Sequence, residues 1–180
     1  KKINILFGIL AMFFTSLTFA DSEQEGVKYL QNQWEIDNYR LSGKEQDEGF
    51  IALMKVADSM VSDYPKSAEL YIWRGIIEST YAGVKGGLGA LKYAKLAKAD
   101  LETALQINAL ALEGSAYTSL GTLYFNVPGW PIGFGDDEKA EQLLKKALAI
   151  NPDGIDPNYF YGVYLRNEKR YSEAKRFLDK

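Results

Sequence analysis

The chain has 180 residues, of which 47% are hydrophobic and 25% charged, with a net charge of −3 and neither cysteine nor histidine. This length is sufficient for one domain with a hydrophobic core. The missing residue types exclude disulfides, histidine-dependent catalytic triads, cysteine nucleophiles and metal sites built from histidine or thiolate. The slight acidic excess, without any long basic run, argues against nucleic acid as a partner.

The first twenty residues are typical of a secretory signal peptide. They begin with two lysines, continue with an apolar run from Ile3 to Phe14 and end with small residues at Thr18 and Ala20. A membrane anchor is the alternative, but this apolar run is shorter than the roughly 20 residues that a spanning helix needs. We therefore expect cleavage after Ala20, a periplasmic or secreted location in a bacterium, and no membrane association after cleavage.

Residues 21–66 predict a pair of helices. Apolar side chains recur at helical spacing, first around Leu30 and Trp34 and then from Phe50 to Val61. We expect this pair to cap one end of the helices that follow.

The remainder of the chain contains an internal repeat. Ala140 and Ala174 are separated by 34 positions, and so are Leu144 and Leu178. A period of about 34 residues is the length of a unit made of two antiparallel helices. We divide the chain after the capping pair into three copies, which span residues 67–109, 110–152 and 153–180.

The residue types within the copies extend this pattern. The middle copy has Tyr117, Leu120, Gly121 and Tyr124 in its first helix and Ala140, Leu144, Ala147 and Pro152 in its second; the other copies have Gly75, Ala97 and Leu101, and Gly162, Ala174 and Leu178. Small residues such as Gly121 and Ala140 let two helices approach closely. This pattern resembles the tetratricopeptide repeat (TPR) family. The resemblance implies an all-α fold over residues 21–180, a right-handed α-solenoid of about eight helices with a shortened or truncated last helix.

Two segments are longer than the family's unit allows. They are "YAGVKGGLGALKY", which starts at Tyr81, and "NVPGWPIGFG", which starts at Asn126. Insertions in a repeat form loops on one side of the stack, often the binding side. Because the insertions occupy equivalent places in neighbouring copies, we expect them to lie side by side.

Two interpretations of the second insertion remain open. In one, the segment closes over a groove, with Trp130 as its anchor or lid. In the other, Trp130, Ile132 and Phe134 pack on the helices as a small satellite core. The acidic residues that follow, from Asp136 to Glu138, are expected to cap the next helix rather than to bind metal or catalyse a reaction.

The glycine-rich segment around Lys85 superficially suggests phosphate binding. However, it lacks the strand and the residue order of a nucleotide-binding P-loop, so we expect a helix end and a turn instead. A weaker anion contact, with Lys85 and Lys92 nearby, remains open.

In TPR proteins the first helix of each unit lines the concave surface, and the resemblance transfers this role to specific positions. They are Ile72, Ile76, Ser79, Thr80, Ser115, Thr118, Thr122, Phe125, Asn126, Asp156, Tyr159, Val163, Arg166 and Asn167. Arg166 could bind a ligand carboxylate bidentately, or it could form a surface salt bridge instead. Aromatic residues could stack on a ligand, or simply pack as core. Our candidate ligand-binding residues are Tyr81, Lys85, Thr118, Thr122, Asn126, Trp130, Tyr159 and Arg166.

These observations favour a non-enzymatic exported protein that binds a protein or peptide in a concave groove. The alternative is a small-molecule-binding accessory protein of a solute transporter. We expect no catalytic residues, no metal, no cofactor and no nucleic-acid partner.

Overall fold

The structure, a computed structural model, describes residues 7–180, with side chains from Ser22 onward except that of Leu88. These residues form eight α-helices and one 3₁₀ helix, without a β-strand. The elements are α1 (Phe7–Tyr39), α2 (Gly43–Asp63), α3 (Ala68–Lys85), α4 (Gly87–Asn108), η1 (Ala111–Gly114), α5 (Ser115–Asn126), α6 (Asp137–Ile150), α7 (Ile155–Asn167) and α8 (Tyr171–Leu178). The predicted all-α class is confirmed.

The predicted signal peptide lies outside the residues whose side chains are described, so its cleavage and the location of the protein remain predictions. In the described part of the chain, no helix combines the length and the apolar character needed to cross a membrane.

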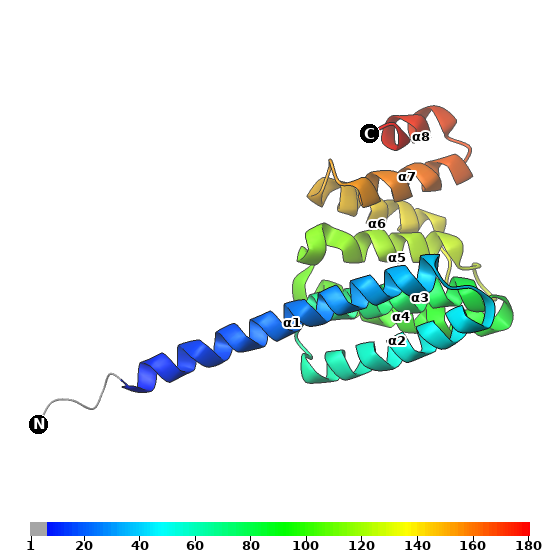
Figure 1. The fold of residues 1–180 in the computed structure, drawn as a ribbon. Helices are drawn as coiled ribbons and strands as arrows, with labels where there is room; N and C mark the ends of the chain where they lie inside the picture. Colours follow the sequence, from blue (N-terminus) through cyan, green and yellow to red (C-terminus); the bar gives the residue numbers. More distant parts are fainter. Residues whose placement is uncertain (1–6) are drawn as a thin grey trace, which may run out of the picture.

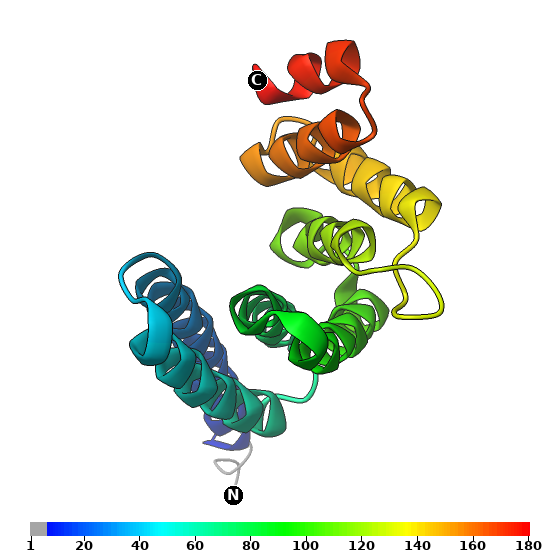
Figure 2. The same cartoon turned by 90° about the vertical axis from the view of Figure 1, so that its right-hand side faces the viewer.

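Successive helices pack as hairpins along a curved array (Figures 1 and 2). Each helix contacts the next one, and α1, α3, α5 and α7 also contact one another in that order. The odd-numbered helices therefore form the inner side of the curve, where elements are closest together. The even-numbered helices form the outer side.

One close helix contact recurs in three hairpins. At each of three helical glycines, a Cβ atom would lie within 3 Å of a leucine Cγ in the partner helix, beside an alanine carbonyl oxygen. The trios are Gly75 with Leu101 and Ala97, Gly121 with Leu144 and Ala140, and Gly162 with Leu178 and Ala174. The predicted close approach at Gly121 and Ala140 is thus confirmed, because only a residue without a side chain fits there.

The hydrophobic core has two parts. Residues of α3 to α8 form the larger part, in which Leu101, Leu144 and Leu165 are fully buried. The smaller part joins α1 and α2 to α3 around Leu30 and Phe50. The pair α1 and α2 thereby covers one side of α3.

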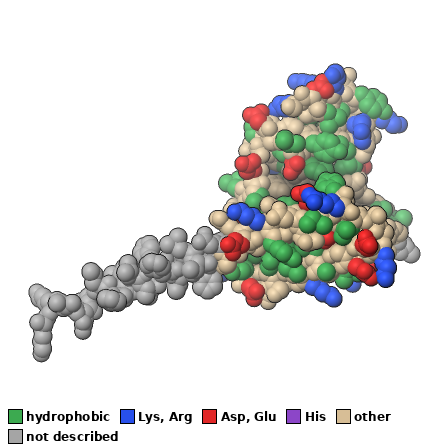
Figure 3. Space-filling view, in the orientation of Figure 1, with side chains coloured by type: hydrophobic (Ala, Val, Ile, Leu, Met, Phe, Trp, Pro, Cys, Tyr) green, Lys and Arg blue, Asp and Glu red, His purple; other side chains and the backbone are tan. Residues whose placement is uncertain are grey.

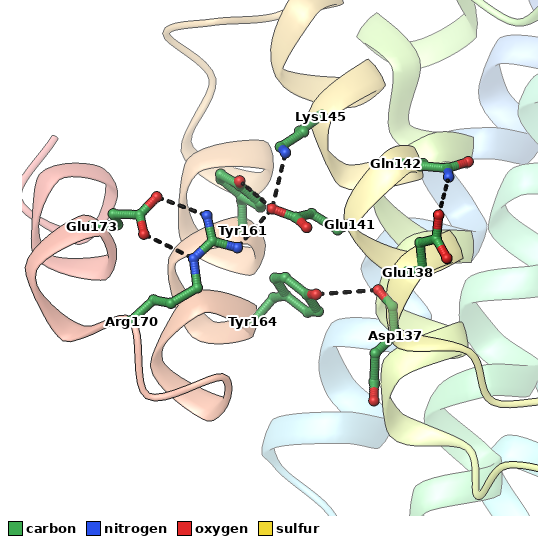
Figure 4. A network of polar contacts seen from close by, with 9 residues as sticks. All are labelled: Asp137, Glu138, Glu141, Gln142, Lys145, Tyr161, Tyr164, Arg170 and Glu173. Atoms are coloured by element: carbon green, nitrogen blue, oxygen red, sulfur yellow. Dashed lines mark hydrogen bonds and ion pairs between the residues drawn. The ribbon is translucent and has the colours of Figure 1, made fainter.

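Polar contacts attach the short last helix to its neighbours (Figure 4). Arg170 donates one hydrogen bond of 2.7 Å to Glu141 of α6 and two, of 2.8 and 2.7 Å, to Glu173 of α8. The Tyr161 hydroxyl also donates to Glu141, at 3.0 Å, and Lys145 pairs with it at 2.9 Å. These donors, Arg170 foremost, lower the pKa of Glu141 to about 2. The carboxylate therefore stays charged and links α6, α7 and α8.

The first insertion does not form the expected loop. Helix α3 continues to Lys85 and α4 starts at Gly87, so only Gly86 separates the helices and the inserted residues form extra helical turns. Gly86 and Gly87 have φ angles of 60° and 55°, which reverse the chain within one step. The added turns are stabilised by Tyr81, whose buried ring contacts Phe50 of α2. The second insertion is a true loop.

Candidate functional site

A cavity of about 900 Å³ lies on the concave side of the array. Its walls come from the odd-numbered helices, from the first turns of α4 and from the loop that follows α5. Figure 3 shows this face, where hydrophobic side chains gather around a hollow and charged side chains of both signs are dispersed. Pockets that bind small molecules typically measure about 300–1,000 Å³, so the cavity can hold a ligand of substantial size.

Three aromatic side chains form one wall of the cavity. Trp34 and Tyr39 of α1 and Trp73 of α3 meet edge to face, with ring centroids 5.7 and 5.9 Å from that of Trp34. The Trp34 indole is held in place because its Nε1–H donates to Thr80 Oγ1 at 3.0 Å. Sequence reasoning missed this wall, since the pattern in residues 21–66 indicates helices but not which helix they approach.

The aromatic side chains of α7 form a second wall. Tyr159 and Phe160 contact each other with ring centroids 5.3 Å apart, and Tyr159 remains 54% exposed. An aromatic ring that is half exposed at a cavity offers apolar area to a ligand.

Hydroxyl and amide groups line the floor between these walls. Ser79 and Thr80 donate to the carbonyl oxygen of Ile76 at 2.9 and 2.8 Å. Thr122 donates to the carbonyl oxygen of Thr118 at 2.8 Å. A hydroxyl has a single hydrogen, and these three hydroxyls donate theirs to backbone carbonyl oxygens. Their oxygen atoms can therefore act toward a ligand only as hydrogen-bond acceptors.

Among the described residues that line the cavity, Asp156 is the one with a charged side chain. It lies exposed in the first turn of α7, where the helix dipole stabilises a negatively charged carboxylate. The cavity therefore combines aromatic walls, a floor of hydroxyls and one negative charge.

The two insertions lie side by side at the rim, as predicted. The side chain of Leu91 in α4 reaches within 3.4 Å of the position that a Cβ of Gly133 would occupy. Gly87 and Leu91 from one insertion and Pro128 and Ile132 from the other all line the cavity. The equivalent positions of the insertions in neighbouring hairpins explain this contact.

The structure brings four of the candidate ligand-binding residues to the cavity and leaves four outside it. Thr118, Thr122, Asn126 and Tyr159 line the cavity; Tyr81, Lys85, Trp130 and Arg166 do not. Of the other concave positions, Ile76, Ser79, Thr80, Ser115 and Asp156 line it, whereas Ile72, Phe125, Val163 and Asn167 do not.

Tyr81 and Lys85 make intramolecular contacts. The Tyr81 side chain is fully buried, and its hydroxyl donates to Asp47 of α2 at 2.7 Å. Lys85 pairs with the same carboxylate at 3.2 Å. These contacts connect α2 to the end of α3, which accounts for both side chains without a ligand.

Arg166 is exposed on α7 and does not line the cavity. The structure therefore does not support the prediction that Arg166 binds a ligand carboxylate in this cavity.

The loop between α5 and α6 partly matches the satellite-core interpretation. Phe134 packs against the larger core, with its ring 5.5 Å from that of Tyr124. In contrast, 90% of Trp130 and 63% of Ile132 is exposed. The loop then ends in a helix cap, since Asp136 accepts a hydrogen bond of 2.9 Å from the Lys139 backbone N–H. The expected capping role of this aspartate is confirmed.

This arrangement predicts opposite outcomes for two aromatic substitutions in the loop. Trp130→Ala should change the free energy of unfolding by less than about 0.5 kcal/mol, because little surface is buried. Phe134→Ala should cost about 2 kcal/mol, because it removes a half-buried ring from the core. Urea unfolding measures both values, and a larger loss from Trp130→Ala than from Phe134→Ala would contradict the described packing.

A second, more polar cavity of about 480 Å³ lies between α2, α3 and α4. Here Arg74 donates two hydrogen bonds to Asp100, at 2.5 and 2.7 Å, and one to Asp58 at 3.0 Å. Beside them Glu78 is buried, and its Oε2 accepts no hydrogen bond from the described residues. Burial, together with the nearby Asp100 carboxylate, raises the pKa of Glu78 to about 8. No three carboxylates in the described part of the chain are arranged to bind a metal ion.

Neither a comparison with protein-family models nor a search of curated proteins finds a match to this chain.

Proposed function

We propose that this chain is a non-enzymatic TPR-like protein that binds a peptide segment of another protein in the concave cavity. The supporting observation is the cavity itself, about 900 Å³ in volume and lined by the inner helices. As part of the same proposal, residues 1–20 direct the protein to the periplasm.

The recurring glycine contact supports the repeat. Gly75, Gly121 and Gly162 occupy the same place in three hairpins, each against a leucine of the partner helix. A right-handed α-solenoid of TPR-like hairpins accounts for this recurrence, because stacked copies of one unit repeat the same internal packing.

The residue types at the cavity favour binding over catalysis. Its described lining offers aromatic rings, hydroxyls, one amide and a single carboxylate. Recognition sites combine apolar walls with a few polar groups in this way, whereas acid–base catalysis generally needs positioned titratable groups that act together.

A groove-filling substitution tests the proposal. Ser119 lines the cavity, while Ser172 lies exposed on α8 away from it, so Ser119→Trp and Ser172→Trp make the same chemical change at two places. Peptides selected from a random displayed library on the full chain should bind the wild type and Ser172→Trp with equal affinity. They should bind Ser119→Trp at least about tenfold more weakly, which fluorescence anisotropy measures. Failure to select any peptide, or equal binding by all three proteins, would refute peptide binding in this cavity.

A small-molecule carrier is the second candidate, favoured by the loop at the rim and by a volume within the range of ligand pockets. Thermal-shift screening with small organic compounds separates the two functions. A ligand at 100 times its dissociation constant should stabilise the wild type by about 2.7 kcal/mol and Ser119→Trp by much less.

A further inference from the structure

Three oxygen atoms of the cavity lining are left as hydrogen-bond acceptors. The hydroxyl hydrogens of Ser79 and Thr122 are donated to carbonyl oxygens of their own helices, so their oxygens keep lone pairs for a ligand. Asn126 uses one amide N–H on the carbonyl oxygen of Thr122, and its Oδ1 remains an acceptor. The indole N–H of Trp73 has no partner among the described residues, but its nitrogen is buried and does not reach a ligand. A ligand that contacts the oxygens of Ser79, Thr122 and Asn126 therefore donates hydrogen bonds to them.

The charge of the cavity has the same preference. Asp156 forms no ion pair within the described residues, and no lysine or arginine lines the cavity near it. Tyr159 follows Asp156 by three positions on α7, so the two side chains lie on the same face of the helix. A carboxylate next to a half-exposed aromatic ring suits a guanidinium or ammonium group, which can pair with the first and stack on the second.

We infer that the peptide bound in this cavity carries an arginine or lysine that contacts Asp156 and Tyr159, with apolar neighbours against Trp34 and Trp73. This inference rests on the proposed peptide-binding function and specifies the class of segment. A peptide is favoured over a small amine because the aromatic walls of the cavity come from α1 and α7, and these helices lie at the two ends of the inner side (Figure 2). A chain with several side chains contacts both walls at once.

The first experiment reads the composition of selected peptides. Peptides that the full chain selects from a random library should contain lysine or arginine more often than the starting library, and aspartate or glutamate less often. If peptides are selected without this enrichment, the inference fails while the proposed function stands. If no peptide is selected, both the peptide function and the inference fail. This conclusion holds even if a small aromatic amine such as tryptamine binds, because the occupant would then not be a peptide.

The second experiment locates the charge. Asp156→Asn removes the carboxylate at the cavity, and Asp153→Asn removes one three residues earlier, outside the cavity and also near the start of α7. A selected arginine peptide should bind Asp156→Asn about fivefold more weakly than the wild type and bind Asp153→Asn unchanged.

The matched ligand change is arginine to citrulline, which keeps the shape of the side chain and removes its charge. Citrulline should weaken binding to the wild type about fivefold and leave binding to Asp156→Asn almost unchanged, because the partner charge is already missing. Equal losses from citrulline in both proteins, or equal effects of Asp153→Asn and Asp156→Asn, would overturn the assignment to Asp156.

Discussion

Gly121→Val is expected to reduce the free energy of unfolding by about 3 kcal/mol, because valine cannot fit between α5 and α6. A Cβ at this position would lie 2.8 Å from Leu144 Cγ and 3.2 Å from the carbonyl oxygen of Ala140. Both contacts are too short, and neither atom is the far end of a flexible side chain. The helices must therefore separate, and their shared core loses contact.

Gly83→Val is the matched control. Gly83 also lies inside a helix, but a Cβ there would have no atom within 4 Å, so the change should alter stability by less than about 0.5 kcal/mol. Urea unfolding curves with unchanged slopes give both values. Equal effects of the two substitutions would show that the close contact does not govern helix pairing.

A compensating substitution sharpens this test. Leu144→Ala alone should cost about 2–5 kcal/mol because it leaves a cavity in the core. Combined with Gly121→Val, it should cost clearly less than the sum of the two single changes, because valine then occupies the space that leucine vacates. Simple additivity would contradict direct contact between these positions.

Glu78→Gln is expected to stabilise the protein above neutral pH by up to about 5 kcal/mol. The pKa of Glu78 is about 8 in the folded protein and about 4.5 in the unfolded chain, mainly because burial penalises the charged form. Between these values the folded state holds a proton that the unfolded state has lost. The wild type therefore loses stability as the pH rises from about 4.5 to 8, and this pKa difference corresponds to on the order of 5 kcal/mol. Glutamine cannot ionise, so the variant should lack this loss.

Urea unfolding measured at intervals between pH 4.5 and 9 tests this expectation. Glu45→Gln provides the control, because Glu45 is exposed in the first turn of α2 and the substitution changes the net charge by the same amount. A difference between Glu78→Gln and the wild type that does not grow with pH would contradict an ionisable, buried Glu78.

Local sequence patterns predicted the helices and their pairing well. The set formed by Gly121, Ala140 and Leu144 has equivalents in two other hairpins. Two packed helices need small residues at their crossing point and a larger residue beside it, and this requirement involves only neighbouring segments. The resemblance to the TPR family implied several concave positions, such as Ser79, Thr122 and Tyr159, and these residues do line the cavity.

Other assignments failed because they depend on contacts between distant segments. Tyr81 was expected at a ligand, but the approach of α2 buries it against Phe50 and Asp47. Trp34 was expected only as part of a capping helix, yet its bond to Thr80, which is 46 residues away, makes it a cavity wall. The insertion around Lys85 was expected to form a loop, but its residues extend α3 and α4, and only the helix end and turn at Gly86 match the expectation for the glycines.

By itself the sequence determined an all-helical protein, its hairpins, the close glycine contact in three of them and the two adjacent insertions, because periodicity and small residues act locally. Only the tertiary structure decided what the cavity offers a ligand: which aromatic rings enclose it, which hydroxyl hydrogens are already bonded, and that Asp156 rather than Arg166 carries its charge. The physical reason is that the direction and the hydrogen bonding of a side chain depend on every element packed around it.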